Sequence, residues 1–477
     1  MKPVDHISTE TLQRLTASQA WEYRLVPYEA RNGVLGCYGE RGRDYADAVA
    51  ELEVLSGVRV RVEPLEGAEL QKLLGRHYRQ GAGRKASAEV GASLSQIGGG
   101  QGFLMGLIGE AFTSYASDIH FEPYEDRCRI RMRIDGRLVE RYVVDKQNYA
   151  SLVNQIKILS NLDISEKRLP QDGRIFYNRD EMRFDVRVSS LPTIYGEKVV
   201  MRLLTRHVEL LELTNLGLTE RQIADYAAAI SRPHGLVLIT GPTGSGKSTT
   251  LYATLRRLND EARNILTIED PVEYTLEGVN QVQLKEEIGL TFGAALRTFL
   301  RQDPDIIMLG EIRDGDTAGM AIRSSLTGHL VFSTIHTNSA WGSVARLGDM
   351  GVHPYLLSGT LILCAAQRLV RLLCPDCKRA AELTPGERRQ LGPECGAATH
   401  YKAVGCELCY YTGYRGRKAI YEVIPIDEGL AGAVRASAAD VGPLLRERGI
   451  TTLRESALAL FHAGLTSFEE VLPLLNE

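Results

Sequence analysis

The stretch GLVLITGPTGSGKST, residues 235–249, decides the fold of this chain. Its first part is an apolar run, Leu236–Ile239, that predicts a buried β-strand, and the residues from Ser248 onward can open a helix. Between strand and helix, the glycines, Lys247 and Ser248 have the spacing G-x-x-x-x-G-K-[ST]. Glycine lets backbone N–H groups converge on one ligand, and the helix adds the positive end of its dipole. The sequence therefore predicts a phosphate-binding P-loop.

This loop predicts ATP and Mg²⁺ as ligands. Lys247 would supply the positive charge for the β- and γ-phosphates, and the Ser248 hydroxyl would complete the coordination shell of Mg²⁺. A glycine-rich turn without a ligand is the alternative, which the strand before the loop and the helix after it disfavour. The nucleotide-binding residues predicted by the motif are Gly241, Pro242, Thr243, Gly244, Ser245, Gly246, Lys247, Ser248 and Thr249.

Composition and charge narrow the class of protein. The chain of 477 residues is long enough for several domains, and its net charge of -4 disfavours a protein that mainly coats nucleic acid. Residues 1–19 are polar throughout, so we expect no signal peptide. The most apolar window, residues 355–374, contains Gln367, Arg368 and Arg371, and we expect it to form a buried helix. We expect a cytoplasmic protein whose membrane contacts come through a partner.

Changes in composition along the chain predict six segments. They are a small α+β domain at 1–75, a flexible linker at 76–102, a second α+β domain with arginine-rich strands at 103–208, an ATPase domain at 213–370, a tetracysteine element at 371–415 and a helical domain at 416–477. The linker is predicted because its segment has too few large apolar residues to offset the entropy of ordering.

Local patterns predict elements within the two N-terminal domains. In the first, strands are expected at 25–28 and 58–62, with a helix near 44–55. In the second, an amphipathic helix at 103–115 precedes alternating stretches at 128–134 and 138–144, which predict a hairpin around an Asp-Gly turn. Both domains are therefore expected to mix helices with strands.

The ATPase segment predicts an α/β fold with a parallel sheet, because four apolar strands alternate with helices. Ligands of such sheets bind at the carboxyl ends of the strands. The four expected strands are Leu236–Ile239, Ile265–Ile268, Ile306–Leu309 and Leu330–Thr334.

Polar residues follow three of these strands and are candidates for catalysis. Glu311 follows the third strand and is our preferred water-activating residue, although it can instead organise the metal. Glu269 begins an acidic cluster, EDPVE, after the second strand, and His336 follows the fourth. A structural role is the alternative for His336, and His329, at the start of the same strand, is a weaker candidate.

Two C-x-x-C pairs with 28 residues between them predict a structural zinc site of four cysteines. Buried free cysteines are the alternative. Cys395 and His400 lie between the pairs as spare ligands, while Cys37, Cys128 and Cys364 are expected to be ordinary buried thiols. The four predicted ligands are Cys374, Cys377, Cys406 and Cys409.

Ordered motifs in the ATPase segment resemble those of the secretion ATPase superfamily, which powers type II secretion, type IV pilus assembly and related machines. GPTGSGKSTTLY is similar to its Walker A motif, TIEDPVE to its Asp box, DPDIIMLGEIRD to its Walker B motif and TGHLVFSTIHTN to its His box. The resemblance continues upstream through ASDIHFEP, RMRIDGRL, RLPQDGRI and DVRVSSLPTIYGEKVVMRLL, and covers nearly everything after residue 103.

The resemblance implies a homohexameric ATPase with a RecA-like core and an upstream PAS-like domain. By that resemblance Arg187 and Arg202 would reach the γ-phosphate, and Arg297, Arg301 and Arg313 would line the nucleotide or a subunit interface. A guanidinium brought to the γ-phosphate by domain closure offsets transition-state charge, so hydrolysis becomes coupled to movement.

Within the superfamily, the single compact N-terminal module resembles the type II secretion branch (GspE type). The resemblance implies that residues 1–75 dock on a GspL-type inner-membrane protein, that the motor acts on a GspF-type platform protein, and that the protein is recruited peripherally to the inner membrane. The alternatives are the pilus assembly branch (PilB type), a nucleic-acid translocase and a non-catalytic scaffold. The chain shows no basic stretch interleaved with aromatic residues, so no nucleic-acid partner is expected.

Overall fold

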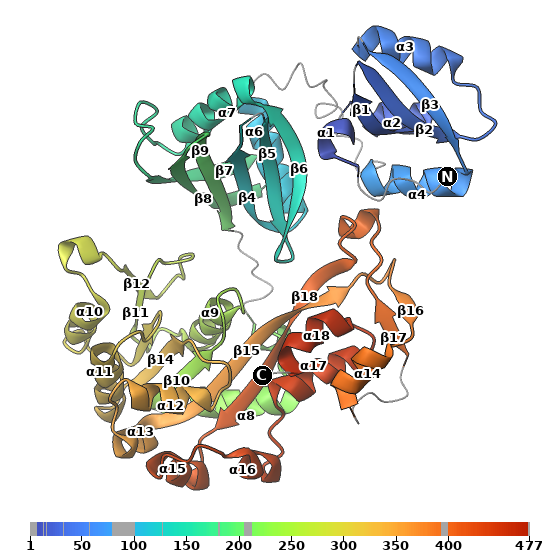
Figure 1. Ribbon diagram of the computed structural model, residues 1–477. Coiled ribbons are helices and arrows are strands. Elements are labelled where there is room, and N and C mark those ends of the chain that lie inside the picture. The colour runs from blue at the N-terminus through green and yellow to red at the C-terminus, as the bar shows by residue number, and fades with distance from the viewer. Residues whose placement is uncertain are drawn as a thin grey trace. The chain divides into compact units, whose positions relative to one another are not determined.

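The computed structural model describes residues 7–475 apart from positions 13, 16, 32, 57, 126 and segments 79–100, 180–181, 205–211 and 393–398. Most of the predicted linker, 76–102, and Cys395 therefore lie outside the described residues. The chain divides into two compact units (Figure 1). One unit comprises residues 1–205 with 404–414, and the other comprises residues 206–403 with 415–477.

The N-terminal part contains a small sheet with the strand order β1-β2-β3, in which β1 and β2 are antiparallel and β2 and β3 are parallel. The expected strands and helix of this part are confirmed. β2 was not predicted, because Gly36 and Gly39 interrupt its apolar pattern. A Cβ at Gly36 would lie 2.7 Å from the Tyr28 ring. The elements are α1 (Thr9–Leu12), α2 (Ala17–Tyr23), β1 (Leu25–Arg31), β2 (Val34–Glu40), α3 (Ala46–Ser56), β3 (Arg59–Leu65) and α4 (Gly67–His77).

The second part of this unit is an antiparallel sheet with the order β6-β5-β4-β9-β8-β7. Its apolar face packs with α6 and α7, and its predicted hairpin is confirmed as β5 and β6. Asp135 and Gly136 turn this hairpin with φ angles of 46° and 83°, which suit an Asp-Gly turn. The elements are α6 (Gln101–Thr113), β4 (Ala116–Pro123), β5 (Arg127–Ile134), β6 (Arg137–Asp145), α7 (Lys146–Leu159), β7 (Gln171–Arg179), β8 (Met182–Thr193) and β9 (Gly196–Leu204).

The other unit is built on a sheet of order β12-β11-β13-β14-β10-β15-β18, in which the strands from β12 to β15 pair in parallel. The four predicted strands are confirmed as β10, β11, β13 and β14. The structured segments between Leu213 and Thr360 are η3 (Leu213–Asn215), α8 (Glu220–Ile230), β10 (Gly235–Thr240), α9 (Lys247–Leu258), β11 (Ile265–Glu269), β12 (Asn280–Gln283), η4 (Glu286–Ile288), α10 (Phe292–Phe299), β13 (Ile306–Leu309), α11 (Gly315–Leu326), β14 (Leu330–Ile335), α12 (Gly342–Asp349) and α13 (Pro354–Thr360).

Helices cover both faces of this sheet and form two apolar cores (Figure 1). Helices α8 and α9 pack on one face, and helices α10 to α13 with the C-terminal helices pack on the other. The remaining elements are β15 (Leu361–Leu373), β16 (Arg379–Ala381), α14 (Pro385–Leu391), β17 (His400–Lys402), η6 (Glu407–Cys409), β18 (Tyr414–Pro425), α15 (Glu428–Arg435), α16 (Gly442–Glu447), α17 (Leu453–His462) and α18 (Phe468–Leu475).

The expectation of one buried helix at 355–374 is wrong. Helix α13 ends at Thr360, and the rest of the window forms β15, a strand between β10 and β18. A strand inside a sheet that is covered on both faces shows an unbroken apolar run, which periodicity cannot tell from a buried helix. Among the described residues, no helix has the length and apolar character needed to cross a membrane.

Candidate nucleotide and metal sites

The P-loop lies between β10 and α9 and has the shape that the motif predicts. All residues of β10 are buried, so the strand fixes the start of the loop. Gly241, Gly244 and Gly246 have φ angles of 149°, 81° and 91°, which side chains with a Cβ rarely adopt. A Cβ at Gly241 would also lie 2.4 Å from the carbonyl oxygen of Gln367, so the loop is closely backed by its neighbour. The predicted residues Lys247, Ser248 and Thr249 form the first turn of α9, while the others form the loop.

Lys247 and Ser245 make this loop suitable for a polyphosphate. The Nζ atom of Lys247 donates to the carbonyl oxygens of Gly241 at 2.7 Å and Pro242 at 3.1 Å. Burial lowers the pKa of this ammonium group, while the nearby Glu311 carboxylate acts in the opposite direction. The buried hydroxyl of Ser245 has no hydrogen-bond partner among the described residues. A desolvated cation and an unsatisfied buried hydroxyl both gain from a bound phosphate oxygen.

The candidate catalytic residues follow strands that are neighbours in the sheet, since β11, β13, β14 and β10 lie side by side in that order. Glu311 follows β13, and its side chain is 19% exposed. Its Oε1 atom accepts a hydrogen bond from Arg313 Nη2, and its Oε2 atom lies 3.5 Å from Nε2 of His336, which follows β14. The sheet therefore gathers Glu311, His336 and the P-loop at one edge.

Gly310 fixes the backbone before Glu311. Its N–H donates to the carbonyl of Ile268 at 2.8 Å, and its own carbonyl accepts from the Thr334 hydroxyl at 2.7 Å. A Cβ at this position would lie 3.3 Å from the Cα atom of Glu269, closer than an ordinary contact. The glycine thus lets β13 pass close to the end of β11.

Glu269, the last residue of β11, is buried and fully engaged by hydrogen bonds. Its carboxylate accepts from the Tyr252 hydroxyl, from the Thr267 hydroxyl at 2.6 Å and from the Gln281 amide at 3.1 Å. The next residue, Asp270, lies 3.4 Å from the Arg313 guanidinium. Among the described residues, the structure thus links the acidic cluster to Glu311 through Arg313.

The other arginines predicted from sequence lie elsewhere in the chain. Arg297 is on α10, and its carbonyl accepts from Arg301 Nη1 at 3.0 Å; both side chains are exposed. Arg187 on β8 and Arg202 on β9 are register partners, and Arg202 Nε donates to Asp118 at 2.9 Å. These last two residues belong to the first unit, whereas the P-loop belongs to the second, so their role at the nucleotide stays a prediction.

Sequence reasoning missed two buried residues of β15 that contact the site. Gln367 backs the P-loop and accepts a hydrogen bond from the Thr250 hydroxyl at 2.9 Å. Arg368 donates to the carbonyl of Asn338, in the segment after β14, at 2.7 Å. The available signal was the presence of polar residues within a mainly apolar window, but these residues served only to exclude a membrane span.

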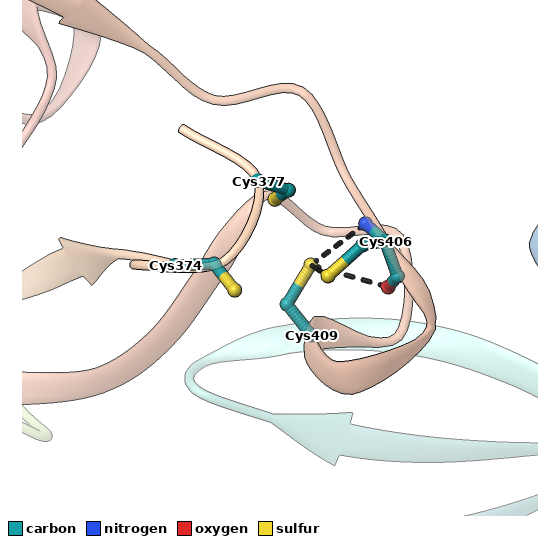
Figure 2. A group of neighbouring side chains, drawn as sticks. All are labelled: Cys374, Cys377, Cys406 and Cys409. Carbon is teal, nitrogen blue, oxygen red and sulfur yellow. Dashed lines mark hydrogen bonds between the residues drawn. The ribbon is translucent and has the colours of Figure 1, made fainter. Parts of the chain in front are cut away.

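The four predicted cysteine ligands form one cluster, in which a ligand atom of each lies within 4.8 Å of the others (Figure 2). Cys374 directly follows β15. The Sγ atom of Cys409 accepts the N–H groups of Cys406 at 3.1 Å and Gly413 at 3.3 Å. Four sulfurs at this spacing therefore fit a tetrahedral structural metal site.

The other three cysteines that the structure describes behave as expected. Cys37, Cys128 and Cys364 are buried and free, and burial raises the pKa of the Cys37 thiol to about 12. His400 is outside the metal cluster found in the described residues; its ring stacks on Phe461 at a centroid distance of 4.7 Å. His400 is therefore a packing residue in this structure.

The parallel sheet, the P-loop after a central strand and the carboxylate after the third strand define a P-loop ATPase with a RecA-like core. A family model described as "Type II/IV secretion system protein" matches residues 101–473. The type II secretion system protein E of Aeromonas hydrophila is 42% identical over 455 residues, covering 90% of this chain and 90% of that protein. The chain therefore belongs to the type II/IV secretion system protein family, and it is an ATP-hydrolysing enzyme.

Two further relatives come from pilus machines. The type IV pilus assembly ATPase PilB of Thermus thermophilus is 43% identical over 433 residues, covering 87% of this chain but 49% of that protein. A solved structure of the pilus retraction motor PilT with bound ADP is 26% identical with a TM-score of 0.54, covering 77% of this chain and 96% of that chain. The matched length favours the type II secretion branch over pilus assembly.

Proposed function

We propose that this chain is the ATPase of a type II secretion system, with Glu311 as the residue that activates the attacking water. The observation that carries the proposal is the convergence of the P-loop, Glu311 and His336 at the ends of adjacent strands. A carboxylate beside a phosphate-binding loop can orient water for attack on a γ-phosphate. The extensive match to a type II secretion relative supports the same function.

The proposed roles follow from the position of each side chain. Lys247 would bind the β- and γ-phosphates, and Ser248, exposed in the first turn of α9, would hold Mg²⁺. Bound Mg²⁺ supplies charge neutralisation at the phosphates. His336 would hold the Glu311 carboxylate in place, and the buried Glu269 would fix the loop that carries Asp270 and, through it, Arg313.

We propose further that the active form is a homohexamer in which arginines complete the site. Arg187 and Arg202 would approach the γ-phosphate, and Arg297, Arg301 and Arg313 would line the nucleotide or the subunit boundary. Arginine suits this role because a guanidinium stays charged and offers two parallel donors to phosphate oxygens. Hydrolysis would then depend on assembly.

The test is steady-state ATPase activity of the assembled wild type and of three variants. Lys247→Ala should weaken nucleotide binding, and Glu311→Gln should bind nucleotide normally but turn over at least about a hundredfold more slowly. Glu261→Gln, which alters an exposed carboxylate beyond α9, should leave both quantities unchanged. Equal turnover by the wild type and Glu311→Gln would overturn the assignment of Glu311 and favour a nucleotide-binding scaffold.

The proposed partners are a GspL-type inner-membrane protein bound by residues 1–75 and a GspF-type platform protein, with peripheral recruitment of a cytoplasmic motor. The support is the 90% match to the Aeromonas protein, which includes part of the N-terminal region. The full chain and a chain lacking residues 1–100 are compared as baits in an inner-membrane extract. Loss of a GspL-type protein on truncation supports the proposal. Recovery of pilus assembly components instead would favour the PilB-type function, which the Thermus relative supports.

We propose zinc as the metal of the four-cysteine cluster. Four thiolates in a closed set suit tetrahedral Zn²⁺, and they leave no open coordination position for a substrate. The cluster also lies beside short elements with few apolar residues, for which a metal can replace a core. The ion would therefore be structural.

A further inference from the structure

Gln367 lies where β15 runs alongside the beginning of the P-loop. Strands β10 and β15 are parallel, and Thr240, the last residue of β10, is the register partner of Ala366. Gln367 is therefore the first residue of β15 past the end of β10. Its side chain is 2% exposed, so it is a buried polar group directly beside a loop that has no regular structure.

Both ends of the P-loop pack closely against Gln367, with no room for a Cβ. A Cβ at Gly241, the first residue of the loop, would lie 2.4 Å from the Gln367 carbonyl oxygen. A Cβ at Gly246, the last residue of the loop, would lie 2.7 Å from Gln367 Nε2. Glycine is required at both positions for two reasons: a Cβ would clash with Gln367, and the φ angles are positive. One residue of β15 therefore forms the support for both ends of the loop.

A hydrogen-bond chain fixes the orientation of the Gln367 carboxamide. Its Oε1 atom accepts from the Thr250 hydroxyl at 2.9 Å, and that hydroxyl also lies 3.0 Å from the Tyr421 hydroxyl. Thr250 is one turn into α9, and its N–H donates to the Gly246 carbonyl at 3.1 Å. With the oxygen bound to Thr250, the amide nitrogen is left on the side of Gly246. The chain thus ties the loop to α9 and to β18.

We propose that Gln367 is a positioning residue that holds the P-loop in its phosphate-binding shape before nucleotide arrives. The proposal rests on the nucleotide site described above and deepens it. Three glycines with positive φ give the loop many alternative shapes, and ordering them at the moment of binding costs affinity. A neutral carboxamide suits this place, because it braces the backbone without adding negative charge next to the phosphates. Gln367 acts through the loop and contacts no reacting atom.

The experiment measures the Kd of a fluorescent ATP analogue, and the KM and kcat of Mg·ATP, on the full-length chain. Gln367→Leu keeps the side-chain volume but removes both polar atoms. It should raise Kd and KM about tenfold while kcat at saturating ATP stays within about twofold. Thr250→Val should raise Kd about fivefold, and Thr250→Ser, which keeps the hydroxyl, should restore wild-type affinity.

Thr254→Val is the matched control. Thr254 is one turn further along α9 and is equally buried. Its hydroxyl bonds Tyr226 and the backbone carbonyl of Thr250, and not the Gln367 side chain, so its variant should bind nucleotide like the wild type. Equal Kd values for wild type and Gln367→Leu, or equal effects of Thr250→Val and Thr254→Val, would overturn the proposal. If Gln367→Leu does not fold, the three threonine variants decide it alone. A wild type that binds no nucleotide would instead overturn the proposed function.

Discussion

The Nε2 atom of His336 lies 3.5 Å from the Oε2 atom of Glu311, although the two residues follow different strands. Neighbouring strands β13 and β14 bring them together, since both end at the same edge of the sheet. Each side chain is therefore placed by the sheet rather than by its loop alone. Contact with the imidazole restricts the orientations of the carboxylate before the reaction. Less conformational entropy is then lost when the carboxylate aligns the attacking water.

Replacing His336 by alanine should lower kcat without weakening nucleotide binding. Arg313 remains bound to the other carboxylate oxygen, so we expect a loss of about ten- to a hundredfold and not complete inactivation. ATPase rates and nucleotide Kd measured on the same preparation check this. His329→Ala is the matched control, because His329 precedes β14 and bonds the carbonyl of Ser324. A similar loss in both variants would argue against a role for His336 at Glu311.

Gly310→Ala should reduce turnover by shifting Glu311. The added Cβ would lie 3.3 Å from Glu269 Cα and 3.3 Å from the Ile268 carbonyl, and backbone atoms yield little. We expect kcat to fall about tenfold or more. Gly319→Ala, inside α11 and with no atom nearer than 3.8 Å to the new Cβ, should keep activity and gain about 0.5–1 kcal/mol of stability. Full activity in Gly310→Ala would show that the tight approach does not position Glu311.

Arg202→Ala should lower kcat in the assembled protein while nucleotide affinity changes little. Arginines supplied at an interface stabilise the transition state, and their loss commonly costs about 10³-fold or more in rate. Arg183→Ala provides the comparison, since Arg183 is also exposed on the same sheet. Rates are compared at protein concentrations where both variants have the same oligomeric state by light scattering. Equal rates for the two variants would place Arg202 outside the catalytic machinery.

Glu122→Gln should destabilise the antiparallel sheet in a pH-dependent manner. Burial alone would raise the pKa of Glu122, but hydrogen bonds from Arg131 and Arg129 outweigh it and lower the pKa to about 2. Glutamate in the unfolded chain has a pKa of about 4.3. The stabilisation by the Glu122 carboxylate is therefore complete at pH values above about 4.3 and disappears as the pH falls toward 2. We expect a loss of about 2 kcal/mol at pH 7 that shrinks below about pH 4.

Denaturant unfolding at a series of pH values measures this difference. Glu125→Gln, which changes an exposed carboxylate two residues after the end of the same strand, should unfold like the wild type at every pH. A destabilisation by Glu122→Gln that stayed constant down to pH 2.5 would show that packing, and not the ion pairs, is responsible.

Purified protein should contain about one zinc ion per chain, measured by elemental analysis, if the cysteine cluster is a complete Zn²⁺ site. Cys377→Ser or Cys406→Ser should lower both the zinc content and the unfolding temperature, because the ion replaces missing apolar contacts. Cys37→Ala, which removes a buried thiol of the N-terminal sheet, should keep its zinc. A wild-type protein prepared with available zinc but free of metal would contradict the assignment.

Much of the ATPase fold was predictable, because its strands are short apolar runs that end in polar residues. The P-loop signal was strong since only a few residue types tolerate positive φ angles beside a phosphate. β15 was misread because its burial on both faces removes any alternation, and Leu- and Ala-rich composition favours a helix locally. β2 was missed because its two glycines, Gly36 and Gly39, have low strand propensity. They are present because neighbouring side chains leave no room for a Cβ, which the sequence does not reveal.

The site was predicted less completely than the fold. Glu311 and the four cysteines stand in motifs, so local spacing revealed them. Gln367 and Arg368 act through contacts with segments more than twenty residues away, and a single sequence holds no record of those contacts. The link between Glu311 and His336 likewise depends on the order of strands in the sheet, which follows from packing over the whole unit.

Strands β15 and β18 are neighbours in the sheet, yet nearly the whole tetracysteine segment lies between them in sequence. The chain therefore leaves the sheet after Leu373, builds an accessory element that carries the four-cysteine cluster, and returns at Tyr414 to the adjacent position. Loops can lengthen at modest entropic cost when their ends are already fixed by pairing. Such an element can be gained, lost or exchanged between lineages without redesign of the motor, and it offers a ready position for grafting a foreign recognition module.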